Sequence, residues 1–187
     1  ALALALISLN IAKAQKLDTT TWSTNFFVKT IAVDSNYTYI GGDFTYVGPN
    51  TGGGAKITTT NTNPDLTFPR VNGAIFTTVP DGAGGWYIGG EFTKVGMYAR
   101  NYIAHIKANK TVDTTWNPNI NSGGTYNVKT IALSGTTLYL GGTFHNIGSL
   151  NRNNIARLSA TSGVVDSAWN PNSNGDVFAI AVSGSEI

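Results

Sequence analysis

One segment recurs three times along the chain and constrains its fold more than any other feature. It reads Tyr, an aliphatic residue, two glycines, a variable residue and Phe, and an aliphatic-Gly pair follows three residues later. The copies run from Tyr39 to Phe44, from Tyr87 to Phe92 and from Tyr139 to Phe144, with second glycines 48 and 52 residues apart. Self-similarity at such a period is the signature of a repeat architecture. The repeat therefore decides the fold class before any single motif does.

Two other features keep the same phase as the glycine pair. An apolar, strand-like run precedes each pair, and an Asp-x-x-aromatic tail follows each pair at 26 or 27 residues. We predict first strands at Val28 to Val33, Val71 to Phe76 and Val128 to Leu133, with a fourth beginning at Val177. The tails are Asp65 to Phe68, Asp113 to Trp116 and Asp166 to Trp169. Each repeat thus has a start and an end that can be read directly.

Each repeat holds four predicted strands. The second strand ends in Gly-Gly, the third is expected at Arg100 to Ile106 or Arg152 to Leu158, and a short fourth lies near the tail aromatic residue. Four strands per repeat is the blade of a β-propeller. We therefore predict an all-β fold, a β-propeller with about three and a half four-stranded blades of an incomplete ring. The blades are expected at approximately 28–70, 71–120 and 128–174, with the next starting at 177.

The motif residues have predicted structural roles. Glycine lacks a Cβ, so the pairs allow a bulge or a positive φ where the strand leaves the blade. The aromatic residues fill the space between blades, and each tail aspartate caps its own turn through its side chain. The structural motif residues are Gly41, Gly42, Phe44, Gly89, Gly90, Phe92, Gly141, Gly142, Phe144, Trp116 and Trp169.

Composition excludes several classes of function. The chain has 22 glycines and only 12% charged residues, which favours short strands and tight turns. It has no cysteine, so disulfides, thiolate nucleophiles and cysteine-ligated zinc are excluded. The net charge is only +2 and no run of Lys or Arg occurs. We therefore expect no nucleic-acid partner.

The N-terminus resembles an export signal. Residues 1–12 are almost wholly apolar and lead into Ala12-Lys13-Ala14, which has the small-x-small form of a signal-peptidase site. The run is shorter than the roughly 20 residues that a membrane span needs. We predict a partial signal peptide at 1–14, propeller repeats at 15–187 and no membrane span; a buried strand or core helix is the alternative. Residues 18–22 resemble one more tail, which we expect to complete the last blade as an orphan strand.

The repeat resembles a known family. The string Tyr-Ile-Gly-Gly-x-Phe-Thr-x-Val-Gly, then Arg-Asn-x-Ile-Ala-x-Ile, then Val-Asp-x-x-Trp-Asn-Pro-Asn is similar to the delta-sixty type, kelch-like β-propeller repeat of bacterial secreted and cell-surface proteins. The resemblance covers Asp18 to Ile187. It implies a propeller fold and an exported location. The first copy departs from the pattern, because Gly52 and Gly53 stand in place of Arg-Asn and leave its third strand open.

Few residues suggest chemistry. His105 and His145 occupy different repeat positions without a metal-ligand spacing, so structural or surface roles are expected and no metal. Asp43 and Glu91 are equivalent, and a solvent-facing or turn-capping role is favoured over an acid-base pair because the third copy has Thr143.

Two recurring arginines are the candidate ligand-binding residues. Arg100 and Arg152 each lie eight residues after the motif Phe. A row of guanidinium groups would suit an acidic glycan or a carboxylate; the alternative is that they bond carbonyl groups between blades. No motif for a cofactor is present, so none is predicted.

The sequence favours a non-catalytic binding or display scaffold, secreted or on the cell surface. Regular repeats without an irregular His, Asp or Glu cluster are typical of a scaffold, since function on such a frame resides in irregular loop residues. The expected partner is a protein or a glycan at the cell surface. One alternative is a structural segment of a large exported protein, recognised by the export machinery. The other is a propeller enzyme with its site in missing blades, so catalysis is not expected from the residues present.

Overall fold

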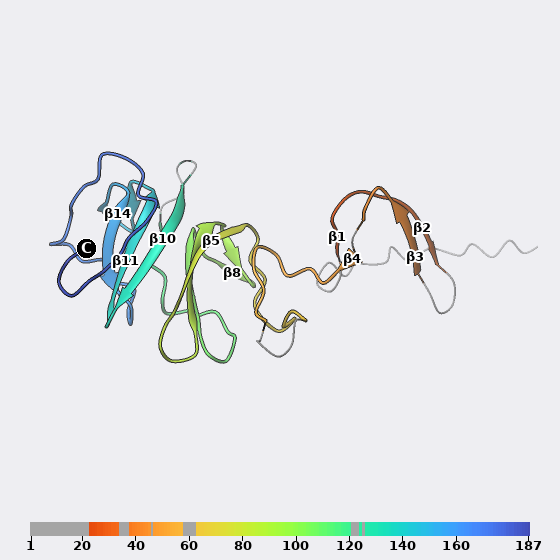
Figure 1. Ribbon diagram of the computed structural model, residues 1–187, viewed down its shortest axis with the longest axis horizontal. Helices are drawn as coiled ribbons and strands as arrows, with labels where there is room; N and C mark the ends of the chain where they lie inside the picture. The colour runs from red at the N-terminus through yellow and green to blue at the C-terminus, as the bar shows by residue number, and fades with distance from the viewer. Residues whose placement is uncertain (1–22, 34–37, 46, 58–62, 121–123, 125) are drawn as a thin grey trace, which may run out of the picture. The chain divides into compact units, whose positions relative to one another are not determined.

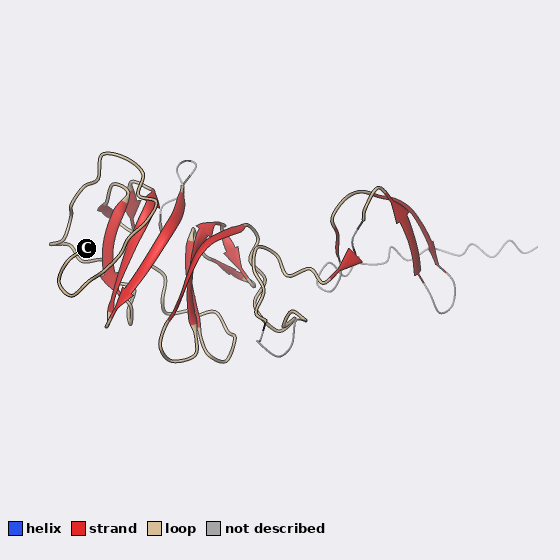
Figure 2. Ribbon diagram, viewed as in Figure 1, coloured by secondary structure: helices blue, strands red, loops and turns tan. Residues whose placement is uncertain are grey.

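The computed structural model describes residues 23–33, 38–45, 47–57, 63–120, 124 and 126–187. Every regular element assigned within these residues is a strand (Figure 2). The all-β prediction is confirmed. No helix able to cross a membrane occurs in these ranges. The predicted signal peptide at 1–14 and the orphan tail at 18–22 lie outside the described residues.

The chain divides into two compact units, which we describe separately: residues up to Asn50 and residues from Thr51 onward. The first unit contains an antiparallel hairpin, β2 (Val28–Val33) with β3 (Thr38–Gly42). A second pair joins β1 (Ser23–Thr24) to β4 (Val47–Gly48) (Figure 1).

The second unit contains two three-stranded antiparallel sheets (Figure 1). The sheet of the second copy is β5 (Ala74–Pro80), β6 (Trp86–Glu91) and β9 (Ile103–Ile106). The sheet of the third copy is β10 (Asn127–Ser134), β11 (Thr137–Thr143) and β14 (Ile155–Ser159). The tail joins the outer strand of each sheet by one bridge, Ile106 to Val112 and Leu158 to Val165. The predicted fourth strand is therefore a single bridged pair.

Two short ribbons connect the second strand to the third in these copies. They are β7 (Lys94–Val95) with β8 (Tyr98–Ala99), and β12 (Asn146–Ile147) with β13 (Leu150–Asn151). The glycine of the aliphatic-Gly pair makes each turn, with φ of 57° at Gly96 and 58° at Gly148. Glycine adopts this left-handed conformation without steric cost.

Three strand predictions differ from the structure. The first strand of the second copy begins at Ala74 and not at Val71, because Val71 instead bridges to Val95. The third strands begin three residues after the recurring arginines. Residues 177–182 form no strand; the Val177 N–H donates to the Gly142 carbonyl at 3.2 Å. The predicted blade boundaries stay a prediction.

The glycine pairs lie opposite a bulge, as predicted. In all three copies the register of the first strand shifts by one residue beside the pair. A Cβ on Gly90 would lie 2.1 Å from the Ala74 carbonyl oxygen, and one on Gly142 would lie 2.2 Å from that of Asn127. Neither glycine has a left-handed φ. The pair is required by close backbone approach and not by backbone conformation.

The main core of the second unit lies between its two sheets, where β10 packs against β5 and β6. Trp116 from the second copy and Phe144 and Leu140 from the third are fully buried there. A second cluster on the other face of β6 contains Phe92. Trp116 and Phe144 thus fill the space between the second and third copies, and burial removes roughly 150–250 Å² of surface per ring from water. Phe44 and Trp169 are only partly buried.

Candidate functional site

Two groups of polar residues stand out in the second unit: a buried cluster around His105 and a polar cleft beside Glu91. The buried cluster derives from a position that recurs in the repeat. Each copy has a basic residue on the third strand or at the equivalent position. The backbone carbonyl of this residue accepts a hydrogen bond from the N–H of the tail aspartate. The three pairs are Lys56 with Asp65 at 2.8 Å, His105 with Asp113 at 2.9 Å and Arg157 with Asp166 at 2.9 Å.

The tail aspartates cap their own turns, as the sequence predicts. One carboxylate oxygen of each accepts a backbone N–H two residues later: Thr67 at 3.0 Å, Thr115 at 3.1 Å and Ala168 at 2.9 Å. In two copies the other carboxylate oxygen contacts the third-strand base, His105 or Arg157. Asp113 and Asp166 therefore fix both the turn and the third-strand base, whereas Asp65 pairs with Lys110 instead.

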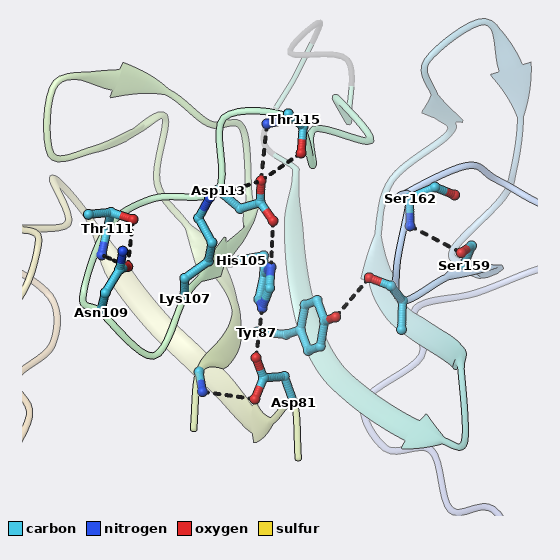
Figure 3. A network of polar contacts seen from close by, with 12 residues as sticks. Asp81, Tyr87, His105, Lys107, Asn109, Thr111, Asp113, Thr115, Ser159 and Ser162 are labelled. Atoms are coloured by element: carbon cyan, nitrogen blue, oxygen red, sulfur yellow. Dashed lines mark hydrogen bonds and ion pairs between the residues drawn. The ribbon is translucent and has the colours of Figure 1, made fainter. Parts of the chain in front are cut away.

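His105 is held by two carboxylates (Figure 3). Its Nδ1 lies 3.0 Å from Asp113 Oδ2, and its Nε2 lies 3.0 Å from Asp81 Oδ2. The side chains of all three are only 11–13% exposed. The imidazole stacks on Tyr87, with ring centres 4.4 Å apart and planes at 19°. The Tyr87 hydroxyl donates to the Ala160 carbonyl of the next copy at 2.7 Å, so the cluster lies at the interface between two repeats.

Hydrogen bonds keep both carboxylates ionised. Burial raises the pKa of Asp81, but bonds from His105 and from the N–H groups of Ala83 and Gly85 outweigh burial and hold this pKa below its ordinary value. Asp113 is similar. Burial raises its pKa, but hydrogen bonds from Thr115 and His105 lower it by more, so this pKa also lies below its ordinary value. Within the described residues, no group of three His, Asp or Glu side chains is arranged to hold a metal ion.

The candidate arginines are buried and bond to carbonyl groups. Arg100 is 6% exposed and donates to the carbonyls of Ala99 at 2.7 Å and Asp113 at 2.8 Å. Arg152 is 4% exposed and donates to Asn151, Asp166 and Ser167. Each guanidinium ties the approach to the third strand to the tail of the same copy, not to another blade. Ligand binding by either arginine stays a prediction.

The cleft lies where β6 ends and the segment leading into β10 passes it. Its volume is about 360 Å³, and we call it the Glu91 cleft. Its lining residues are Asn72, Glu91, Phe92, Thr93, Tyr102, Gly124 and Tyr126. The rings of Tyr102 and Tyr126 meet edge to face, with centres 6.3 Å apart, and Tyr126 also packs against the exposed His145.

The wall of the Glu91 cleft is fixed by an Asn–Thr clamp. Asn72 Nδ2 donates to Thr93 Oγ1 at 3.0 Å, and Asn72 Oδ1 accepts the N–H groups of Thr93 and Lys94. Asn25 and Thr45 make the same pair of bonds in the first copy. Among the lining residues, Glu91 has an exposed carboxylate, the Tyr126 ring is half-buried, and Tyr102 is buried.

Glu91 and Tyr102 are electrostatically linked. Burial, followed by the charge of Glu91, raises the pKa of the Tyr102 hydroxyl above its ordinary value. The hydroxyl is therefore a neutral donor near pH 7. The cleft thus offers a carboxylate acceptor beside a phenolic donor.

Comparison with known proteins agrees with the architecture. The family described as "Domain of unknown function (DUF5122) beta-propeller" matches residues 137–168, from the start of β11 through the tail aspartate of the third copy. The chain carries β-propeller repeats. No curated protein and no solved structure matches it. The β-propeller prediction is confirmed, and the matched residues lie in the sheet and tail of the third copy.

Sequence reasoning found the propeller frame but missed the cleft. Glu91 was recognised only as a solvent-facing or turn-capping position, and its exposed carboxylate fits the former. Tyr102 and Tyr126 were not singled out. One signal was present: Tyr102 stands where the next blade has Asn154, and both are left-handed, with φ of 65° and 62°. Asn tolerates that conformation far better than an aromatic residue does, so Tyr102 departs from the local preference.

Proposed function

We propose that this chain is a non-catalytic, secreted or cell-surface binding module that takes a glycan in the Glu91 cleft. The observation that carries the proposal is Tyr102, a buried tyrosine in a left-handed conformation at a position where the next blade has Asn154. Strained residues persist where the surroundings impose them, and they concentrate at ligand sites. The strain at Tyr102 holds its ring at the cleft.

The chemistry of the cleft supports a glycan. The half-buried Tyr126 has an apolar ring face and a polar tip, a combination that suits sugar rings. Glu91 accepts hydrogen bonds from sugar hydroxyl groups, and charge-assisted bonds are stronger than neutral ones. The cleft volume of about 360 Å³ falls within the usual range for ligand pockets.

The polar residues favour binding over catalysis. Most glycoside hydrolases use two carboxyl groups that flank the bond, and Glu91 is the one carboxylate among the described residues that line the cleft. The carboxylates of Asp81 and Asp113 are engaged in hydrogen bonds within the frame. The apolar N-terminal run with its small-x-small sequence supports export of the module, and passage through an export machinery belongs to the same proposal.

Saturation-transfer NMR with a panel of neutral oligosaccharides tests the proposal. We expect saturation transfer to at least one member of the panel. Tyr126→Ala and Glu91→Gln should each weaken binding by about tenfold or more, since each removes a stacking face or a charged acceptor. The affinity should change little with salt, because the ligand is uncharged.

Met97→Ala is the matched control, since Met97 is 79% exposed and lies outside the cleft lining. It should bind as the wild type does. Binding that neither cleft variant changes would place the site elsewhere. Absence of saturation transfer to every oligosaccharide would refute the glycan assignment. If saturation transfer to charged peptides were then seen and fell strongly with added salt, a protein partner would be indicated.

A further inference from the structure

The third-strand basic position differs among the repeats in one chemical respect. It holds Lys56, His105 and Arg157 in the three copies. Lysine and arginine carry their charge throughout the neutral range, whereas histidine changes charge between pH 5 and 8. The position is therefore a permanent cation in two repeats and a conditional one in the second.

The geometry at His105 places both ring nitrogens where they can donate to a carboxylate. Both ring nitrogens lie 3.0 Å from carboxylate oxygens. An ionised carboxylate only accepts hydrogen bonds, so each ring nitrogen bonds to its carboxylate only when that nitrogen carries a proton. A neutral imidazole would turn a lone pair toward a carboxylate in a place that is nearly closed to water, which is unfavourable.

The two carboxylates cannot turn away without breaking other bonds. Asp81, in the turn between β5 and β6, also accepts the N–H groups of Ala83 and Gly85 at 2.7 and 2.8 Å. Asp113, in the tail, also accepts the backbone and hydroxyl groups of Thr115. Two further charged groups face Asp113: Lys107, whose exposed Nζ lies 3.9 Å from Asp113 Oδ1, and the buried guanidinium of Arg100, which donates to the Asp113 carbonyl at 2.8 Å. Tyr87 is the titratable group stacked on the ring.

The His105 ring is connected to the contact between blades. Tyr87, stacked on it, donates to Ala160 in the next copy. The ring centre of Trp116 lies 5.2 Å from that of Tyr87 and 6.1 Å from that of His105, and Trp116 is fully buried. A Cβ on Gly163 of the next copy would lie 3.3 Å from Trp116 Nε1. A shift of His105 therefore disturbs two contacts that join the blades.

We propose that His105 is a proton-dependent lock on the interface between the second and third blades. Protonation of both ring nitrogens closes the lock across Asp81 and Asp113. Loss of one proton to solvent as the pH rises opens it, and the interface loosens through Tyr87 and Trp116. The stability that the lock contributes is thus present at mildly acidic pH and lost toward alkaline pH.

Hydrogen exchange measured by mass spectrometry on the full chain tests this lock. After correction for intrinsic exchange, opening of β6 and β14 in the wild type should rise about tenfold or more between about pH 5 and about pH 9, the cost of losing a buried charged hydrogen bond. His105→Arg supplies the permanent cation found at Arg157 and should show little pH dependence. His105→Gln should open readily at every pH. Equal pH dependence in the wild type and His105→Arg would overturn the proposal.

Imidazole ¹⁵N spectra provide a second test that needs no variant at the lock. The chain has two histidines, so in the His145→Gln variant every imidazole signal comes from His105. Both nitrogens should show imidazolium shifts at mildly acidic pH, and loss of one proton should coincide with the rise in exchange. An unprotonated nitrogen at the acidic end, or a titration that does not track the exchange, would contradict the lock.

Discussion

At the residue scale, each glycine of the pair has its own steric reason. A Cβ on Gly89 would lie 2.6 Å from Val128 Cγ1 and 3.0 Å from Ile131 Cδ1, both in the next blade. A Cβ on Gly90 would strike the bulged strand of its own blade. The first glycine admits the neighbouring blade, and the second admits the bulge.

Gly90→Ala should lower the free energy of unfolding by roughly 1–3 kcal/mol, as overpacking against backbone does. The Ala74 carbonyl belongs to a paired strand and cannot yield as a flexible side chain would. Urea unfolding measures the loss. Gly175→Ala is the control, because a Cβ there meets nothing within 4 Å, and it should change stability by no more than about 0.5 kcal/mol. Equal effects of the two substitutions would refute the steric account.

Sequence reasoning succeeded at this scale where a constraint is local. The aspartate turns and the glycine bulges involve neighbours in the sequence or in one hairpin, so the residue type reveals the geometry. The pairing of Tyr102 with Tyr126 could not be read in the same way. These residues belong to different copies and meet only because one blade packs on the next.

At the scale of elements, the recurring arginines explain where the third strands begin. Arg152 is held by three carbonyls, and β14 starts only after the chain has passed this anchor. The apolar run at Val71 places the predicted start of the first strand of the second copy three residues too early, because the residues before Ala74 are also held outside the sheet. Val71 is buried, but it serves a bridge to Val95 in the ribbon and not the sheet. Hydrophobicity alone does not distinguish these two uses.

Arg152→Met should destabilise the chain by about 1–3 kcal/mol, since it removes the three hydrogen bonds from the buried guanidinium to partly buried carbonyl groups. Arg152→Lys should lose less, because one ammonium group can satisfy part of the set. Denaturant unfolding measures both. Lys94→Met, at an exposed position, is the control and should be nearly neutral. Stability unchanged in Arg152→Met would contradict an anchoring role and strengthen the ligand-binding prediction.

At the scale of the whole molecule, each described repeat of the second unit contains aspartates whose pKa is lowered in the folded state, and these groups respond to acid. The hydrogen bond from Arg157 lowers the pKa of Asp166, that from Lys110 lowers the pKa of Asp65, and that from Lys129 lowers the pKa of Asp176. Asp81 and Asp113 shift in the same direction despite their burial. Acid sensitivity is therefore distributed over the second unit and is not confined to one site.

Stability should fall as the pH drops below about 4, the ordinary range of aspartate. A carboxyl group whose pKa is lower in the folded state stabilises the fold above its unfolded pKa, and this contribution disappears as the pH falls through the folded value. Urea midpoints measured from neutral to strongly acidic pH should reveal the decline. Asp113→Asn keeps the acceptor of the turn but not the charge, so its decline should be shallower. A flat wild-type profile would contradict the role of these carboxylates.

The Glu91 cleft borders the one connection whose length differs most between repeats. The stretch from the tail aromatic residue to the bulged strand runs from Phe68 to Ile75 in one repeat and from Trp116 to Val128 in the next, five residues longer. Surface connections tolerate insertions at little thermodynamic cost. The surroundings of this cleft can therefore diverge from one repeat to the next by lengthening a single joint, while the sheets on either side keep their dimensions.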